Sequence, residues 1–230
     1  MDKKVEFKVG DETLRGSLFV PSGNGPFPGV ICLHGSGGVG EMYFEIAEKL
    51  GEKGIAGLAF NYRGTGISDG KFEDQSVLDG IKDTRAAFNF LISRDFIDKE
   101  RIGVIGGSFG GFLAALLSNE LDLKSIVLTA PSAYSPKRHH EQRDAGSQHD
   151  DFKESDSYRE IAKFKGNLLV IKHEFDEEIF PGMVEGYFEQ AKSAKKEWYI
   201  LKGAKHRVSI YPEIRAVLVN RVVDWFLKTL

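Results

Sequence analysis

The chain of 230 residues contains a single cysteine, Cys32, which lies within an apolar run. One cysteine cannot form an internal disulfide, so we expect Cys32 to be a buried core thiol. No apolar run approaches the roughly 20 residues that a membrane-spanning helix requires. At the start of the sequence, apolar residues alternate with charged ones, and the apolar core of a signal peptide is lacking. These absences predict a cytoplasmic protein that does not enter a membrane.

The sequence also lacks an excess of positive charge. Its 31 Lys and Arg residues oppose 34 Asp and Glu residues, and the formal net charge is −3. Nucleic-acid binding requires a basic face, so we expect no nucleic-acid partner. The length and the ordinary apolar content of 41% predict one domain over residues 1–230. The oligomeric state stays open.

Apolar runs typical of buried strands alternate with segments typical of helices from residue 29 to the end of the chain. Before them, in residues 5–20, apolar residues alternate with polar ones on both sides of the Gly10-Asp11 turn, which predicts an antiparallel hairpin. Regular alternation of strands and helices predicts an α/β fold with a mostly parallel central sheet covered by helices on both faces. The predicted strands are 29–33, 55–61, 102–105, 126–130, 167–172 and 197–201, and the predicted helices are 41–53, 76–93, 112–117, 182–194 and 212–230.

The chain changes from strand to helix at a serine surrounded by glycines. The pattern Gly106-x-Ser108-x-Gly110 fits a nucleophile elbow, a strained turn that exposes a serine hydroxyl at the top of a sheet. A side chain two residues before or after that serine would collide with the packed strand and helix, which accounts for the glycines. The pattern alone also fits an ordinary glycine-rich turn between a strand and a helix. Whether Ser108 is a nucleophile therefore depends on whether the rest of the chain supplies a base, an acid and a second oxyanion donor.

With these features, the chain resembles the α/β-hydrolase superfamily over essentially its whole length, in its branch of small serine esterases and dienelactone-hydrolase-like proteins. The resemblance implies a triad in the chain order serine, acid, histidine, with each member at the carboxyl edge of the sheet. It makes Ser108 the nucleophile. The acid is expected after the strand 168–171, where Asp176 matches the family pattern best and Glu177 is its rival. The proline of that loop, Pro181, comes one residue later than is common.

The histidine of the family follows the last strand, and the segment Gly203-x-x-His206 resembles that ending. A serine hydroxyl is a poor nucleophile until an imidazole takes its proton, and the imidazole needs a carboxylate that fixes its tautomer. His206 and Asp176 would supply these two groups to Ser108.

The resemblance also implies an oxyanion hole. The turn His34-Gly-Ser-Gly-Gly38 resembles the family's H-G-x-G turn, so the backbone N–H groups of Ser36 and Phe109 are expected to bind the oxyanion. His34 is expected to shape this turn, and Arg63 and Ser68 are expected to be structural residues of the loop 62–68.

Residues 132–163 are polar and fall where the family inserts its cap. We expect a short cap here, with Tyr134 and Phe152 as candidates for the wall of the substrate pocket. The histidines and aspartates of this segment could hold a metal, but their spacing matches no ligand pattern; they are His139, His140, His149, Asp144, Asp150 and Asp151.

A dinucleotide site is a competing hypothesis, since Gly35–Gly40 reads G-x-G-x-x-G between a strand and a helix. The next strand ends without the acid that would bind a ribose, although Arg63 could suit a 2′-phosphate. The sequence predicts instead a serine hydrolase, foremost a carboxylesterase acting on a small-molecule ester, with no metal or organic cofactor. Peptidase, thioesterase and lactonase activities use the same machinery. A non-catalytic binding protein on this fold is the alternative of another class.

Overall fold

The computed structural model describes residues 2–38, 40–143 and 150–230. Its centre is an eight-stranded sheet in the order β1-β2-β4-β3-β5-β6-β7-β8. The strands are β1 Asp2–Val9, β2 Glu12–Phe19, β3 Phe27–Leu33, β4 Ala56–Asn61, β5 Ile97–Gly107, β6 Ser125–Thr129, β7 Asn167–His173 and β8 Lys195–Leu201. β2 pairs antiparallel with both β1 and β4, and the other pairs are parallel. The predicted α/β fold with its antiparallel hairpin is confirmed.

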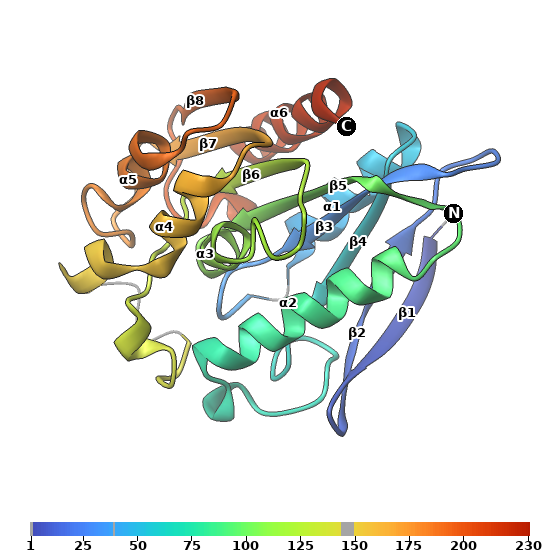
Figure 1. Ribbon diagram of the computed structural model, residues 1–230, viewed down its shortest axis with the longest axis horizontal. Coiled ribbons are helices and arrows are strands. Elements are labelled where there is room, and N and C mark those ends of the chain that lie inside the picture. The colour runs from blue at the N-terminus through green and yellow to red at the C-terminus, as the bar shows by residue number, and fades with distance from the viewer. Residues whose placement is uncertain (1, 39, 144–149) are drawn as a thin grey trace.

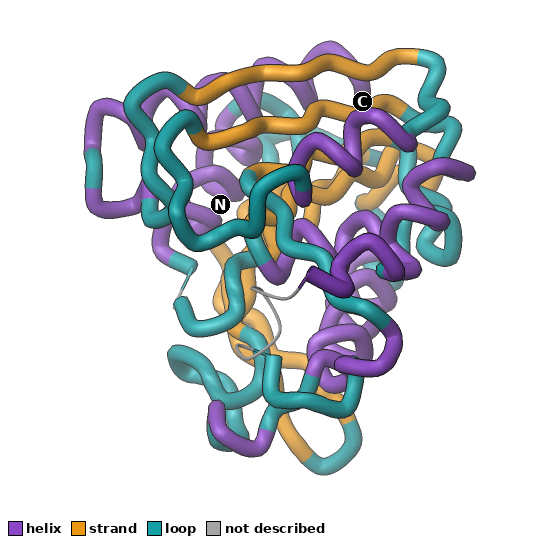
Figure 2. The backbone as a smooth tube through the Cα atoms, turned by 90° about the vertical axis from the view of Figure 1, so that its left-hand side faces the viewer, coloured by secondary structure: helices purple, strands orange, loops and turns teal. Residues whose placement is uncertain are grey.

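In the described part of the chain, six α-helices cover the two faces of this sheet (Figure 1). They are α1 Glu41–Glu52, α2 Val77–Ile92, α3 Phe109–Leu116, α4 Asp156–Lys163, α5 Met183–Gln190 and α6 Pro212–Thr229. Short 3₁₀ turns lie at Phe72–Asp74, Pro136–Arg138, Asp150–Glu154 and Val208–Ile210. Helices α1 and α6 pack on one face and α2 to α5 on the other, so the sheet is the middle layer of three. The strands at its two ends run in clearly different directions, as the twist of a sheet requires (Figure 2).

The alternation of side chains along a strand explains why both faces are covered. In β3, Val30 and Cys32 enter the core under α1 and α6, whereas Ile31 and Leu33 enter the core under α2 and α3. All four are fully buried, and such a strand reads as a continuous apolar run. Cys32 is the buried thiol that the sequence predicts, and burial raises its pKa.

The helix boundaries follow local signals where those exist. Ser76 caps α2 in a capping box with Asp79, a pair that satisfies two otherwise unpartnered N–H groups. Helix α5 ends at Gln190, before the predicted end at residue 194. Helix α4, which the sequence did not predict, lies inside the expected cap segment 132–163 and packs against α3 and α5. Residues 144–149 of that segment, with Asp144 and His149, lie outside the described residues.

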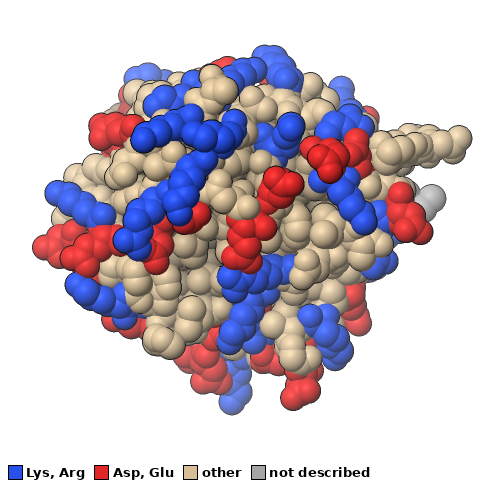
Figure 3. All heavy atoms as spheres, viewed as in Figure 1, with Lys and Arg blue, Asp and Glu red and all other residues tan. Residues whose placement is uncertain are grey.

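The surface agrees with the balanced charge of the sequence. On the face shown in Figure 3, basic and acidic side chains are interspersed. Within the described part of the chain, no helix combines the length and the apolar character needed to cross a membrane.

Candidate active site

Ser108 occupies a strained turn between β5 and α3. Its backbone has φ 51° and ψ −119°, a conformation that costs a residue with a side chain on the order of 1–3 kcal/mol. A Cβ atom on Gly106 would lie 2.2 Å from the carbonyl oxygen of Gly110, and one on Gly110 would lie 2.2 Å from that of Leu33. The predicted steric reason for both glycines is therefore confirmed.

Backbone hydrogen bonds hold this turn against the neighbouring strand. The N–H of Ser108 donates to the carbonyl of Thr129 (3.2 Å), at the end of β6. The carbonyl of Ser108 accepts from the N–H groups of Ser132 (3.0 Å) and Phe112 (3.1 Å). Phe109 is the first residue of α3, where backbone N–H groups have no partner within the helix. The turn thus places a half-buried serine next to N–H groups that can bind an anion.

The loop after β3 passes directly beside the serine. A Cβ atom on Gly35 would lie 3.6 Å from the Cβ of Ser108, so the next residue, Ser36, lies close to the elbow. His34 shapes this loop: its Nδ1 donates to the carbonyl of Gly35 (2.6 Å), and its Nε2 accepts from the N–H of Tyr62 (3.3 Å). Burial lowers the pKa of His34 to about 4, so the ring is neutral at neutral pH.

The acid and the histidine meet at the same edge of the sheet, on the loops that follow β7 and β8. His206 Nδ1 donates to Asp176 Oδ2 at 2.9 Å. The other carboxylate oxygen of Asp176 accepts from the backbone N–H groups of Glu178 (3.0 Å) and Ile179 (3.2 Å). Glu177, the rival acid, is exposed. The carboxylate that contacts the histidine is therefore that of Asp176.

The electrostatics of this pair favour a charged carboxylate. Burial acts to raise the pKa of Asp176, but the hydrogen bond and the charge of His206 and the backbone N–H of Glu178 lower it below its ordinary value. With Nδ1 committed to Asp176, the Nε2 nitrogen of His206 is left as the proton acceptor of the ring. Such a histidine can remove a proton from a nearby hydroxyl.

Two residues that the sequence interpretation missed also surround this pair. Nδ1 of His173 lies 3.9 Å from Asp176 Oδ2, and Glu178 Oε2 lies 3.9 Å from His206 Nε2. His173 stands three residues before the acid at the end of β7, but nothing in the local pattern marks it. Only the fold brings its ring next to Asp176.

The two pocket candidates are buried side chains. Tyr134 is 1% exposed, and its ring packs against those of Phe109 and Phe112. Phe152 is 3% exposed, and its ring centroid lies 5.4 Å from that of Phe180, which is 37% exposed. Phe180, on the acid loop, is the more accessible aromatic of this pair.

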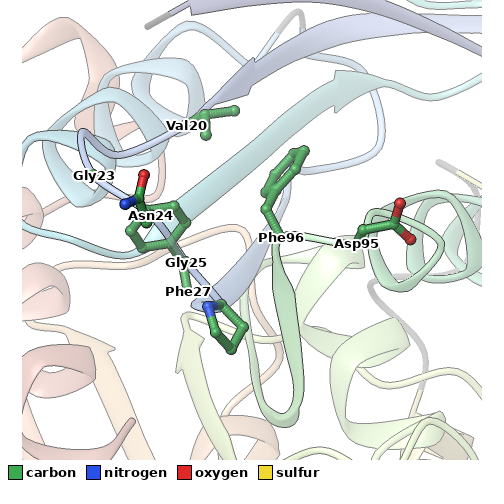
Figure 4. A pocket seen from close by; sticks show the side chains of 8 residues that line it. Val20, Gly23, Asn24, Gly25, Phe27, Asp95 and Phe96 are labelled. Atoms are coloured by element: carbon green, nitrogen blue, oxygen red, sulfur yellow. The ribbon is translucent and has the colours of Figure 1, made fainter.

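Two surface depressions lie away from Ser108. One, of about 490 Å³, is at the amino ends of β3 and β5 and is shown in Figure 4. Its walls are Val20, Gly23, Asn24, Gly25, Pro26, Phe27, Asp95 and Phe96. The other lies between α1 and α6. Neither contains a predicted site residue.

Within the described residues, the cluster suited in composition to a metal is His173, Asp176 and His206, whose ligand atoms lie within 4.8 Å of one another. Hydrogen bonds already explain these positions, since His206 bonds Asp176 and His173 bonds Thr129. The dinucleotide hypothesis loses its 2′-phosphate ligand, because Arg63 is buried among carboxylates. Residue 39 of the Gly35–Gly40 motif lies outside the described residues.

The sequence profile of the prolyl oligopeptidase family matches residues 41–230, a segment that contains Ser108, Asp176 and His206. The chain belongs to the prolyl oligopeptidase family. The expected α/β-hydrolase fold is confirmed, and the relatives and solved structures to which the chain is similar include esterases.

Two curated relatives are similar to part of the chain. The quorum-quenching protein AidA of Acinetobacter baumannii is 31% identical over 55% of this chain and 43% of its own length. Esterase EstD of Thermotoga maritima is 30% identical over 52% of this chain and 31% of its own length. The chain thus spans less than half the length of these relatives.

Solved structures share the fold over nearly the whole chain. The complex of Est1E from Butyrivibrio proteoclasticus with ferulic acid has a TM-score of 0.77, at 20% identity, over 98% of each chain. The esterase Pf2001 of Pyrococcus furiosus has a TM-score of 0.71, at 24% identity, over 100% of this chain and 93% of its own.

Proposed function

We propose that this protein is a serine hydrolase that cleaves carboxylic esters of small molecules through an acyl-enzyme on Ser108. The observation that carries the proposal is the 2.9 Å hydrogen bond between His206 Nδ1 and Asp176 Oδ2, at the sheet edge where Ser108 occupies its strained turn. The esterases among its relatives and structural neighbours support the choice of substrate.

In the proposed reaction, Ser108 Oγ attacks the ester carbonyl while His206 Nε2 takes the serine proton. The tetrahedral oxyanion is bound by the backbone N–H groups of Ser36 and Phe109, and each donor of this kind contributes on the order of 3 kcal/mol. His206 then returns the proton to the departing alcohol, which leaves Ser108 acylated. A water molecule, activated by His206, releases the acid and restores the hydroxyl. Asp176 holds His206 in the required tautomer, and no step uses a metal or an organic cofactor.

A fluorophosphonate probe tests the nucleophile, because it reacts with an activated serine. We expect one adduct, by intact mass, on the wild type and none on Ser108→Ala, with strongly reduced labelling of His206→Ala. Ser22→Ala and His140→Ala are matched controls at exposed positions, and both should label like the wild type. An adduct of wild-type yield on Ser108→Ala would overturn the proposal, as would no adduct on folded wild-type protein.

Peptidase activity is a second candidate, supported by the family and by the uncharacterized peptidase YuxL of Bacillus subtilis, which is 26% identical over 97% of this chain. An amine is a poorer leaving group than an alcohol and depends more on protonation by His206. A panel of p-nitrophenyl esters and dipeptide p-nitroanilides separates the two activities. We expect kcat/KM to be higher for the esters, and the reverse order would favour the peptidase.

A further inference from the structure

His173 is a buried imidazole beside the acid that the proposed reaction does not use. It is the last residue of β7 and is 4% exposed. Its Nε2 lies 2.9 Å from the hydroxyl oxygen of Thr129, the last residue of β6. Its Nδ1 faces Asp176 Oδ2 at 3.9 Å, and this oxygen is the one that accepts the hydrogen bond of His206. The ring therefore stands between a fixed hydroxyl and the carboxylate of the acid.

The surroundings of His173 determine its protonation state. Burial lowers its pKa to about 4, against the opposite effects of the Asp176 carboxylate and the backbone of Lys205. A neutral imidazole carries one N–H. A Thr129 hydroxyl that donates to Nε2 leaves this N–H on Nδ1, the nitrogen that lies 3.9 Å from Asp176 Oδ2, close but beyond hydrogen-bond length. The opposite tautomer would place the lone pair of Nδ1 against the negative charge of Asp176.

Thr129 also belongs to the support of the serine. Its backbone carbonyl accepts the N–H of Ser108 at 3.2 Å, while its side chain contacts His173. A continuous set of contacts therefore runs from the nucleophile elbow through β6 and β7 to the acid. Because strand ends in a parallel sheet are held in register by backbone pairing, these contacts position the acid relative to the serine.

We propose that His173 is a positioning residue whose N–H, oriented by Thr129, attracts the Asp176 carboxylate electrostatically across 3.9 Å and so keeps it in line with His206. The catalytic consequence rests on the proposed function, whereas the structural consequence does not. If the N–H is removed, Asp176 loses a neighbour that restrains Oδ2, and its hydrogen bond to His206 becomes longer or less populated. A displacement of the acid on the order of 1 Å is enough to slow a positioned reaction by tenfold or more.

The test compares two substitutions of similar shape. His173→Asn keeps an N–H donor near the position of Nδ1, and His173→Leu has nearly the same outline without a donor. We expect His173→Leu to lower kcat on a p-nitrophenyl ester by about tenfold with little change in KM, and His173→Asn to recover most of the loss. His140→Leu and His140→Asn, at an exposed histidine, are controls that should leave kcat unchanged.

Proton NMR gives a readout that does not depend on turnover. The His206 Nδ1 proton, which bonds a carboxylate, is expected at low field in the wild type and in Ser108→Ala. It should weaken or shift upfield in His173→Leu and return in His173→Asn. This signal tests His173 even if Ser108→Ala were to keep its activity and the proposed function failed.

Thr129→Val and Thr129→Ser extend the test to the residue that orients the ring, in case His173→Leu does not fold. Thr129→Val replaces only the hydroxyl, by a methyl group. We expect it to lower kcat and weaken the low-field signal, each by less than His173→Leu does. Thr129→Ser keeps a hydroxyl and should retain the kcat and the low-field signal of the wild type. The proposal is overturned if the folded His173→Leu or Thr129→Val protein retains the kcat and the low-field proton of the wild type. It is also overturned if His173→Asn loses as much of the kcat and of the low-field signal as His173→Leu does.

Discussion

Two clusters of charged side chains, one around Arg63 and one around Asp176, differ in how completely their polar atoms are bonded. Arg63 is surrounded by carboxylates: its guanidinium contacts Asp83 (2.6 Å), Glu12 (3.0 Å) and Asp79 (3.4 Å). Its backbone N–H also donates to Asp83, at 3.0 Å. This bonding agrees with the structural role predicted for Arg63 and leaves it no atom for chemistry.

The cluster around Asp176 is bonded only in part. The carboxylate accepts from His206 and from two backbone N–H groups. Nε2 of His206, however, lies 3.9 Å from Glu178, beyond hydrogen-bond length. A saturated cluster holds the backbone in place, whereas one that retains an unbonded imidazole nitrogen can take and return a proton. The four predictions that follow test this distinction, from the largest expected effect to the smallest.

Asp176→Asn should cause the largest loss of activity. An amide in place of the carboxylate favours the wrong tautomer of His206, and the analogous change in a serine protease lowers kcat by about 10⁴-fold. Steady-state kinetics on a p-nitrophenyl ester measure the effect. Glu177→Gln, the neighbouring exposed acid, is the control and should remain within about twofold of the wild type. A large loss in Glu177→Gln with little in Asp176→Asn would exchange their roles.

Asp83→Asn should cause the largest loss of stability. It leaves the buried guanidinium of Arg63 with one carboxylate fewer, and breaking such a pair costs about 3 kcal/mol of unfolding free energy. Urea denaturation measures this, and the folded variant should keep its kcat. Glu12→Gln removes a more exposed partner, with a side chain 35% accessible, so its loss should stay below about 1 kcal/mol. Equal losses of unfolding free energy in Asp83→Asn and Glu12→Gln would contradict the view that the buried carboxylate stabilises Arg63 more than the exposed one.

Asp79 should contribute to stability in acid. Burial acts to raise its pKa, but Ser76, Lys82 and Arg63 together lower it to about 2. A carboxyl whose folded-state pKa is lowered stabilises the fold above its unfolded pKa of about 4 and loses this effect as the pH falls towards 2. With solvent screening, the contribution is about 1 kcal/mol. Urea titrations between pH 6 and 2.5 should show that the unfolding free energy falls less steeply with decreasing pH in Asp79→Asn than in the wild type. The same slope in both proteins would refute this role of Asp79.

Glu178→Gln should have the smallest effect. Glu178 faces His206, but its side chain is 48% exposed and also lies 3.5 Å from Arg207. An exposed pair contributes no more than about 1 kcal/mol, so kcat/KM should change by less than about fivefold, and less at high salt. Measurements at two salt concentrations test this. A loss similar to that of Asp176→Asn would place Glu178 in the catalytic group.

The fold and the elbow could be predicted because their signals are local. Apolar alternation marks the strands, and Gly106 and Gly110 are required by contacts as close as 2.2 Å around one turn. Helix α4 escaped prediction because its exposed face is highly polar and it buries few side chains, among them Tyr158 and Ile161. Tyr134 and Phe152 are buried, and their place in a pocket wall stays a prediction, since composition does not tell an aromatic at a cavity from one in the core.

The sequence by itself determined the succession of strands and of all helices but α4, the turn at Ser108 and the set of residues from which a triad can be built. Only the tertiary structure decided that Asp176, rather than Glu177, accepts the hydrogen bond of His206, and that His173 stands beside the acid. The physical reason is the distance along the chain over which each interaction acts. Backbone strain and side-chain alternation act within a few residues, whereas a hydrogen bond between two loops depends on how neighbouring strands are paired.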